Sequence, residues 1–257
     1  MTIECDKTDA LANYLLRDVD KYPTSHRRGI HHFIRSKVSG GGRDITFVLE
    51  SDPEDYTSSV EVRTEVVGVA TWRRHGTSSA ALEWQRLARG SAYDQFNRFL
   101  VSLEERYNAL FPSLNRCFSL ENLRSVDPVQ NEEWDRDGFR EFWSLEFLQV
   151  FPRWQRRGLS KILMSWGQNQ AGKEAVPIVV SASPVGNLAY RSAGFKSIGY
   201  CGYDRFFDET RFGGEKMQLW VWEPSLGENS NAGWTERARL RREERLYVDN
   251  NYATQSS

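Results

Sequence analysis

The chain is poor in cysteine and has no excess of charge of either sign. Its three cysteines, Cys5, Cys117 and Cys201, are far apart in 257 residues and form no CxxC pair. This pattern argues against a disulfide framework or a cysteine zinc site, and it fits a reducing compartment. The 34 basic and 35 acidic residues leave a net charge of -1. Because so balanced a chain has no overall field to attract nucleic acid or a membrane surface, we expect neither as a partner.

Long apolar runs are also missing. The first residues, 1–9, contain no apolar segment of the kind found in signal peptides, and no stretch approaches the ~20 apolar residues that a membrane helix needs. We therefore expect a cytoplasmic protein, with the nucleus as the other open possibility. The four histidines, His26, His31, His32 and His75, have no Asp, Glu or Cys at metal-ligand spacing. We expect them on the surface or in packing, and we expect no metal.

The apolar content is sufficient for one sizeable core. Hydrophobic residues make up 39% of the chain and aromatic residues 13%, and chains of this length often form one domain. We expect that domain over 1–224, followed over 225–257 by a linker, a charged helix and a disordered tail. The charged segment, 234–247, interleaves Arg with Glu, which is typical of a solvated helix supported by pairs four residues apart.

The most informative stretch is 143–163. Its first part is rich in aromatic and aliphatic residues, as a buried strand is, and Pro152 ends it because proline cannot donate to a sheet ladder. A polar loop containing Gly158 follows, and apolar residues at helical spacing begin at Leu159. The predicted order is strand, tight loop and helix.

The start of that helix is suited to phosphate. A helix N-terminus presents free N–H groups and the positive end of the dipole. Gly158 lets the backbone approach a ligand closely, and the guanidinium groups of Arg156 and Arg157 match phosphate geometry. On its own, the pattern is as typical of an ordinary strand-to-helix turn with solvated arginines.

Two motifs in this half of the chain resemble signatures of the GCN5-related N-acetyltransferase superfamily. The first, Q-R-R-G-L-S at 155–160, is similar to its pyrophosphate motif, Gln/Arg-x-x-Gly-x-Gly/Ala, with Ser160 at the last small position. The second, N-L-A-Y-R-S-A-G-F at 187–195, is similar to Asn-x-x-Tyr-x-x-x-Gly-Phe and follows another predicted strand. The two occur in the expected order. The resemblance covers about 143–222, and more loosely 45–75.

The resemblance implies a mixed α+β fold, in which a central, mostly antiparallel twisted sheet is flanked by helices. The core strand would bulge and diverge from its neighbour, and two N-terminal helices, here 6–20 and 29–38, would form a wall of the acceptor pocket. A mostly helical insertion at about 77–140 precedes the core strand. It is either a lid or wall over the acceptor site or a helical pair packed on the core. Besides the core strand, strands are expected at 45–49, 60–73, 177–183, 195–203 and 216–223.

For the ligand, the resemblance implies direct transfer of an acetyl group from acetyl-CoA to an amine, without a covalent enzyme intermediate. Backbone groups of Leu148 and Val150 would pair with the pantetheine arm. Asn187 would bind that arm near the sulfur, or else cap its helix. The pyrophosphate would lie on the loop formed by Gln155, Arg156, Arg157, Gly158, Leu159 and Ser160.

Tyr190 and Glu146 are the candidate catalytic residues. The resemblance places Tyr190 beside the thioester sulfur, where a phenol of pKa ~10 can donate to a thiolate whose thiol titrates near ~8.5; packing on the core is the alternative. Because alternate strand residues share a face, Ser144, Glu146, Leu148 and Val150 are predicted to point one way. Glu146 would act as the base, directly or through water, or else bind the acceptor ammonium or pair with an arginine.

The expected function is therefore N-acetylation of a small primary amine, by a monomer or a homodimer. A protein or peptide acceptor, at a lysine or an N-terminus, is the first alternative, and the acidic stretch E-E-W-D-R-D at 132–137 leaves it open. The alternative from another class is a non-catalytic acyl-CoA-binding module, against which the intact Asn187 and Tyr190 argue. A P-loop nucleotide binder is excluded because the chain has no G-x-x-x-x-G-K-[ST].

Overall fold

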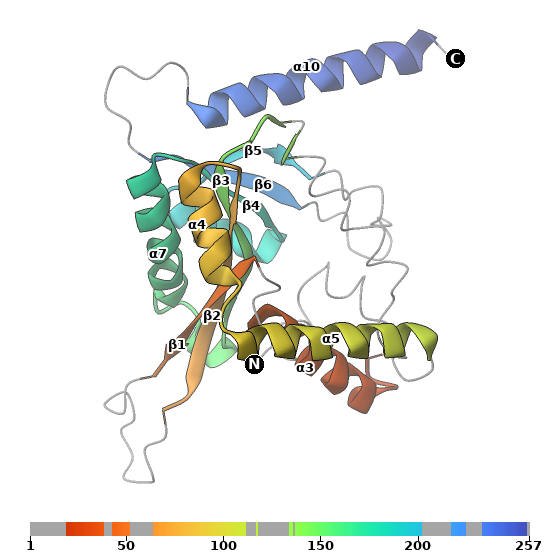
Figure 1. Cartoon of the computed structure of the whole chain (residues 1–257). Coiled ribbons are helices and arrows are strands. Elements are labelled where there is room, and N and C mark those ends of the chain that lie inside the picture. The colour runs from red at the N-terminus through yellow and green to blue at the C-terminus, as the bar shows by residue number, and fades with distance from the viewer. Residues whose placement is uncertain are drawn as a thin grey trace.

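A computed structural model describes residues 19–38, 43–51, 64–111, 117, 134–135, 137–201, 217–224 and 233–255. Figure 1 shows one sheet with helices on both sides, and a pair of helices that extends away from one end of it. The first predicted helix, 6–20, lies almost wholly outside the described residues. Within the part described, no helix has the length and apolarity needed to cross a membrane.

Six strands form one mixed sheet in the order β1-β2-β3-β4-β6-β5. Neighbouring strands are antiparallel except β3 and β4, which run parallel. The predicted mixed α+β class and mostly antiparallel sheet are thereby confirmed. The strands are β1 (Asp44–Glu50), β2 (Val66–His75), β3 (Phe142–Val150), β4 (Ile178–Ala182), β5 (Lys196–Tyr200) and β6 (Gln218–Trp222).

Helix α7 (Leu159–Glu174) joins β3 to β4 and packs on one face of the sheet. Its Leu163 and Met164 are buried in a core cluster with Trp72 of β2 and Trp143 of β3. The helix can approach the sheet this closely because Gly167 has no side chain. A Cβ at that position would lie 2.2 Å from Cη2 of Trp72.

The first part of the predicted helical insertion forms two helices. Helix α4 (Ser79–Ala88) ends before Gly90, whose φ of 64° is one that glycine adopts readily. Helix α5 (Ala92–Leu110) then starts from a capping box between Ser91 and Asp94, which satisfies two of the free N–H groups at its start. The break follows from this local chemistry, which the apolar periodicity alone does not reveal.

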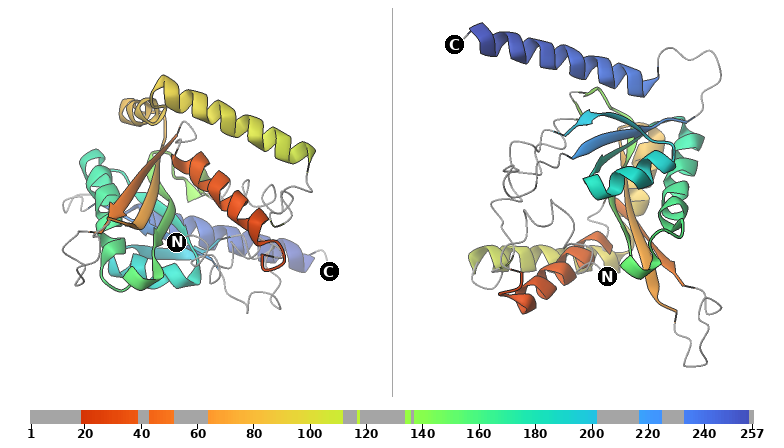
Figure 2. Two further views of the ribbon diagram at one scale, coloured as in Figure 1. Left: turned by 90° about the horizontal axis from the view of Figure 1, so that it is seen from below. Right: turned by 180° about the vertical axis from the view of Figure 1, so that it is seen from behind.

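The two helices of the insertion have different surroundings. Trp84 of α4 packs against the core cluster, with its ring edge-on to Trp143 at 5.2 Å. Helix α5 instead lies beside α3 (Pro23–Val38), where Nη1 of Arg35 donates to Oε2 of Glu104 at 2.8 Å (Figures 1 and 2). Pro23 begins α3, six residues before the start expected from the sequence at 29, and its missing N–H is not needed in the first turn of a helix.

The charged C-terminal segment forms helix α10 (Trp234–Gln255), and its first turns pack on the protein instead of being solvated. Ala238 is fully buried in a second core cluster on the opposite face of the sheet from α7. Nε of Arg242 donates to Oδ2 of the buried Asp137 at 2.8 Å. The helix also continues past residue 247, through most of the segment that composition predicted to be a disordered tail.

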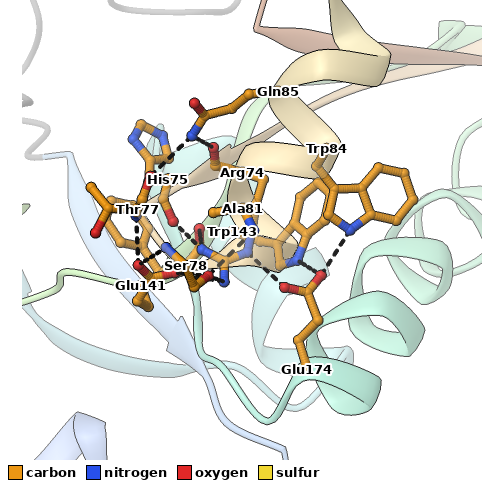
Figure 3. A network of polar contacts seen from close by, with 12 residues as sticks. Arg74, His75, Thr77, Ser78, Ala81, Trp84, Gln85, Glu141, Trp143 and Glu174 are labelled. Atoms are coloured by element: carbon orange, nitrogen blue, oxygen red, sulfur yellow. Dashed lines mark hydrogen bonds and ion pairs between the residues drawn. The ribbon is translucent and has the colours of Figure 1, made fainter.

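A buried arginine connects the insertion to the core (Figure 3). Nε of Arg74, on β2, donates to Glu174 at the end of α7 at 2.8 Å, and Nη2 pairs with Glu141 at 2.9 Å. Oε1 of Glu174 also accepts the indole N–H groups of Trp84 and Trp143, at 2.9 and 3.1 Å. These contacts hold α4, β2, the start of β3 and the end of α7 together.

We expect Gly167→Ala to destabilise the protein. Overpacking against Trp72 costs about 1–3 kcal/mol, which outweighs the gain in helix propensity of up to ~1 kcal/mol. The matched control is Gly172→Ala on the same helix, where a Cβ would meet nothing within 4 Å, so only the propensity gain applies. Thermal unfolding should lower the Tm for the first variant and leave it equal or higher for the second. Equal shifts in both would contradict the close approach of α7 to β2.

Glu141 should contribute a pH-dependent part of the stability. Burial raises its pKa, but hydrogen bonds from the Ser78 side chain, from the Thr77 and Ser78 backbone and from Arg74 outweigh this and lower it to about 2, from an ordinary 4.5. The stability that Glu141 contributes is therefore present above about pH 4.5 and is lost as the pH falls toward 2.

Glu141→Gln should lower the Tm at pH 7, and the difference from wild type should shrink toward zero near pH 2. Thermal unfolding followed by circular dichroism across this range measures it. Glu83→Gln, on the exposed side of α4, is the control and should change little at any pH. A Tm deficit that is the same at both ends of the range would show that the charge of Glu141 is not what matters.

Candidate functional site

The parallel strands β3 and β4 pair only at their first residues. Trp143 is opposite Ile178 and Ser144 is opposite Val179, and the N–H of Trp143 donates to the Pro177 carbonyl at 3.0 Å. Beyond these residues β3 continues beside β2 while its pairing with β4 has ended. The two strands therefore diverge toward their carboxyl ends, where β3 leads into α7.

Strand β3 carries a bulge at Glu146. Its register with β2 passes from Leu145 opposite Trp72 to Phe147 opposite Thr71, so Glu146 is an extra residue without a counterpart. A single inserted residue reverses the alternation of a strand, because the side-chain and peptide directions repeat every two residues. The bulge that the family resemblance implied is thus present, on the residue predicted as the base.

The bulge directs backbone groups of Leu148 and Val150 away from β2. The N–H of Phe151 donates to the Val67 carbonyl on the β2 side, whereas the N–H of Trp143 points to the β4 side. In a regular strand, backbone N–H groups an even number of residues apart point to the same side. Phe151 and Trp143 are an even number apart, so their opposite directions follow from the bulge between them. By alternation from Phe151, the peptide groups of Leu148 and Val150 point toward the side from which β4 has diverged.

The same reversal corrects the prediction that four alternate side chains share one face. Leu148 and Val150 pack against the core cluster on the α7 side. Ser144 and Glu146 are on the opposite face, where Oγ of Ser144 donates to Oε1 of Glu146 at 2.5 Å. The prediction was wrong beyond Glu146 because strict alternation assumes a strand without a bulge.

Glu146 lies in a polar cluster on this opposite face. Oε2 is 3.5 Å from Nη1 of Arg73, and Nε of Arg73 donates to Asp44 on β1 at 2.6 Å. The side chain of Glu146 is only 10% exposed. Pairing with an arginine, one of the roles left open from the sequence, is therefore observed, and it holds the carboxylate in a defined position.

His75 belongs to the same cluster, which sequence reasoning missed. Its Nε2 is 2.8 Å from Oγ of Ser144 and 3.9 Å from Oε1 of Glu146. The ring stacks on Phe142 with centroids 4.3 Å apart. His75 and Ser144 come from different strands far apart in the sequence, so only the β2–β3 pairing brings them together. No spacing rule could have found the contact.

Gly158 begins α7 in a left-handed conformation, with φ 81° and ψ 0°. A Cβ at this position would meet nothing within 4 Å, so the space in front of the helix start is open on this side. Leu159 and Ser160 form the first turn, whose N–H groups are among those that a helix leaves without internal partners. The predicted strand–loop–helix order and the glycine at the helix start are confirmed.

The rest of the loop is held by its own side chains. Nε2 of Gln155 donates to the Val150 carbonyl at 3.1 Å, which fixes the loop to the end of β3. Arg157 lies over the ring of Trp154 at 4.7 Å, and Arg156 is exposed with φ 63°. A positive φ in a residue other than glycine costs on the order of 1–3 kcal/mol and is common at ligand clamps.

Asn187 and Tyr190 lie on the short helix α8 (Asn187–Ser192). Oδ1 of Asn187 accepts from the indole of Trp220 at 3.0 Å, which leaves its Nδ2 oriented as a donor. Gly186, not Asn187, is the N-cap, so the capping alternative was wrong. Tyr190 is buried in the core cluster and edge-on to Phe195 at 5.6 Å, which fixes its ring. The role of its hydroxyl stays a prediction.

The diverging parallel pair, the bulge in its first strand and the glycine that starts the following helix occur together, as the family resemblance implied. The fold is the mixed α+β arrangement that the resemblance to the GCN5-related N-acetyltransferase superfamily implied. No family model matches this chain, and no curated protein matches it either. Among the residues described, no group of three or more His, Cys, Asp or Glu side chains is placed to hold a metal.

Several solved structures are similar to this chain. Drosophila melanogaster polyamine N-acetyltransferase is 15% identical, with 74% of this chain and 78% of that chain covered at a TM-score of 0.37. A mosquito arylalkylamine N-acetyltransferase-like protein is 15% identical, with 62% and 69% covered at 0.32. FeeM, an N-acyl amino acid synthase from uncultured soil microbes, is 11% identical, with 77% and 90% covered at 0.34. Likenesses this distant say nothing about the substrate of this chain.

Proposed function

We propose that the protein is an N-acetyltransferase that moves an acetyl group from acetyl-CoA directly to the primary amine of a small molecule. The observation that carries the proposal is the divergence of β3 from β4 beside an open, glycine-started helix. This arrangement puts backbone donors and acceptors of one strand next to an anion-binding helix start. An extended ligand with a diphosphate at one end and amides along its length fits that combination.

In this proposal the chain holds acetyl-CoA in three places. The N–H groups at 158–160, with Arg156 and Arg157 beside them, bind the pyrophosphate. The peptide groups of Leu148 and Val150 that point away from β2 pair with the pantetheine amides. Nδ2 of Asn187, oriented by its bond to Trp220, donates to a carbonyl of the same arm.

Two side chains then transfer protons during the reaction. Glu146 takes a proton from the acceptor ammonium, because an amine attacks only through a free lone pair. Tyr190 gives a proton to the departing thiolate. Since the amine attacks the thioester directly, the enzyme needs no nucleophile of its own. The acceptor approaches on the face of the sheet that carries Glu146, Arg73 and Asp44.

Thiol release from acetyl-CoA, measured across diamines, arylalkylamines, amino acids and histone peptides, tests the proposal. We expect turnover with one or more small amines. Gly158→Asp should abolish both turnover and acetyl-CoA binding by calorimetry, because it puts bulk and a negative charge at the phosphates. Gly158→Ala is the matched control: it carries the same backbone strain without the charge and should retain measurable binding.

The outcomes separate the alternatives. Turnover with histone peptides alone would favour a protein acceptor over a small one. Tight acetyl-CoA binding without amine-dependent thiol release would indicate a non-catalytic acyl-CoA-binding module. Normal calorimetric binding by Gly158→Asp would rule out the start of α7 as the phosphate site.

Tyr190→Phe should lower kcat by roughly 10²-fold or more, the usual contribution of a general acid, while the Kd for acetyl-CoA stays nearly constant. The ring and its packing on Phe195 are retained, so the loss reports on the hydroxyl alone. Steady-state kinetics and calorimetry on the same preparation measure the two quantities. Tyr200→Phe, at an exposed position of β5, is the control. Equal losses in kcat and in affinity would remove the acid role.

A further inference from the structure

Three polar side chains form a chain of contacts that leads away from the bulge. Oγ of Ser144 lies between Oε1 of Glu146, at 2.5 Å, and Nε2 of His75, at 2.8 Å. All three are on the sheet face opposite α7, and Figure 3 shows the His75 ring leaving β2 in a different direction from the Arg74 guanidinium. Carboxylate, hydroxyl and imidazole thus stand in sequence, each within hydrogen-bond distance of the next.

Exposure is greatest at the His75 end of this sequence. Ser144 is completely buried and the Glu146 side chain is 10% exposed, whereas the His75 side chain is 21% exposed. Aromatic rings surround the imidazole on two sides: Phe142 stacks on it, and Trp134 is edge-on at 5.2 Å. His75 is therefore the member of the three with the greatest access to water, and apolar rings confine its position.

The charge around this sequence favours proton movement along it. Arg73, which in turn is paired with Asp44, pairs with Glu146, and Nη1 of Arg74 donates to the backbone carbonyl of His75. Arg73 contacts Oε2 of Glu146, while Ser144 contacts Oε1. One carboxylate oxygen therefore faces a fixed cation, and the other faces a group that can both donate and accept a proton.

We propose that Ser144 and His75 form a proton relay that carries the acceptor's proton from Glu146 to solvent. This inference rests on the proposed function, with Glu146 as the base. Neither relay residue touches the substrate, and both act through Glu146. The relay explains how a carboxylate with little exposure returns to its ionised form after each turnover.

The proton balance is as follows. An N–H bond of the acceptor ammonium breaks and an O–H bond forms on Glu146, which leaves a neutral amine. The carboxyl proton then passes to Oγ of Ser144 as the serine hydroxyl proton passes to Nε2 of a neutral His75 that carries its other proton on Nδ1. The imidazolium loses its Nδ1 proton to water and regains the starting tautomer by exchange with solvent. No electrons are transferred, and every group ends as it began.

Two variants test the relay against a purely structural role. His75→Gln can keep a hydrogen bond to Ser144 but cannot take up a proton, and Ser144→Ala removes the middle of the chain. Both should lower kcat by roughly tenfold or more with an unchanged Kd for acetyl-CoA. The pH dependence of kcat should change in His75→Gln, because a glutamine side chain cannot take up the relayed proton. His31→Gln, on the exposed surface of α3, is the matched control with wild-type kinetics.

A second readout needs neither acetyl-CoA nor turnover. The His75 ring nitrogens should report the contact by NMR in the free protein, where Ser144→Ala and Glu146→Gln should each change their chemical shifts. His31 should not respond. Unchanged His75 ring shifts in both variants would overturn the relay, as would wild-type kcat and pH profile in His75→Gln. A wild-type protein that turns over no amine would overturn the proposed function and the relay together, whereas an active wild type with a normal His75→Gln overturns the relay alone.

Discussion

One extra residue in β3 determines where the groups of the candidate site point. Without the bulge at Glu146, the side chains and peptide groups of this strand would alternate without a break. The peptide groups of Leu148 and Val150 would then face β2, and their side chains would lie on the same face as Glu146. With it, one short segment presents a carboxylate to one face, apolar side chains to the other and peptide groups toward the departing β4. Bulges commonly re-aim groups next to active sites.

The divergence of β3 and β4 at their carboxyl ends depends on stable contacts at their N-terminal ends. Trp143 is fixed there by its backbone bond to Pro177 and by its indole bond to Glu174. Glu174 also accepts from Arg74 and Trp84, so β2, α4 and the end of α7 are tied to the same point. A parallel pair held at one end and released at the other leaves the end of β3 beside the start of α7 without β4 as its neighbour. The insertion thus supports the site from a distance, through α4.

The sequence was informative where local chemistry decides the structure. The apolar run, Pro152 and Gly158 correctly predicted a strand, a turn and a helix start, because each acts within a few residues. The break at Gly90 and Ser91 could also have been found, since Ser91 and Asp94 have capping-box spacing. The bulge and the contact of His75 with Ser144 could not, because both depend on how β2 and β3 pair. The high charge content of α10 led us to predict a solvated helix. One side of it is buried, where Ala238 packs and Arg242 pairs with Asp137.

Two successive arginines on β2 show how differently the two faces of the sheet use charge. Arg74, with a side chain only 2% exposed, has two carboxylate partners and joins four elements, which is a structural role. Arg73, at 26%, faces the other way and lies between Asp44 and Glu146. Burying ion pairs adds little net stability compared with apolar packing, so stability alone does not account for a second charged cluster on the Glu146 face. The proposed base role of Glu146, which needs a carboxylate that is ionised, oriented and able to exchange a proton, would account for it. The Arg73 pairing then holds one oxygen of Glu146 while the other stays in contact with Ser144 and His75.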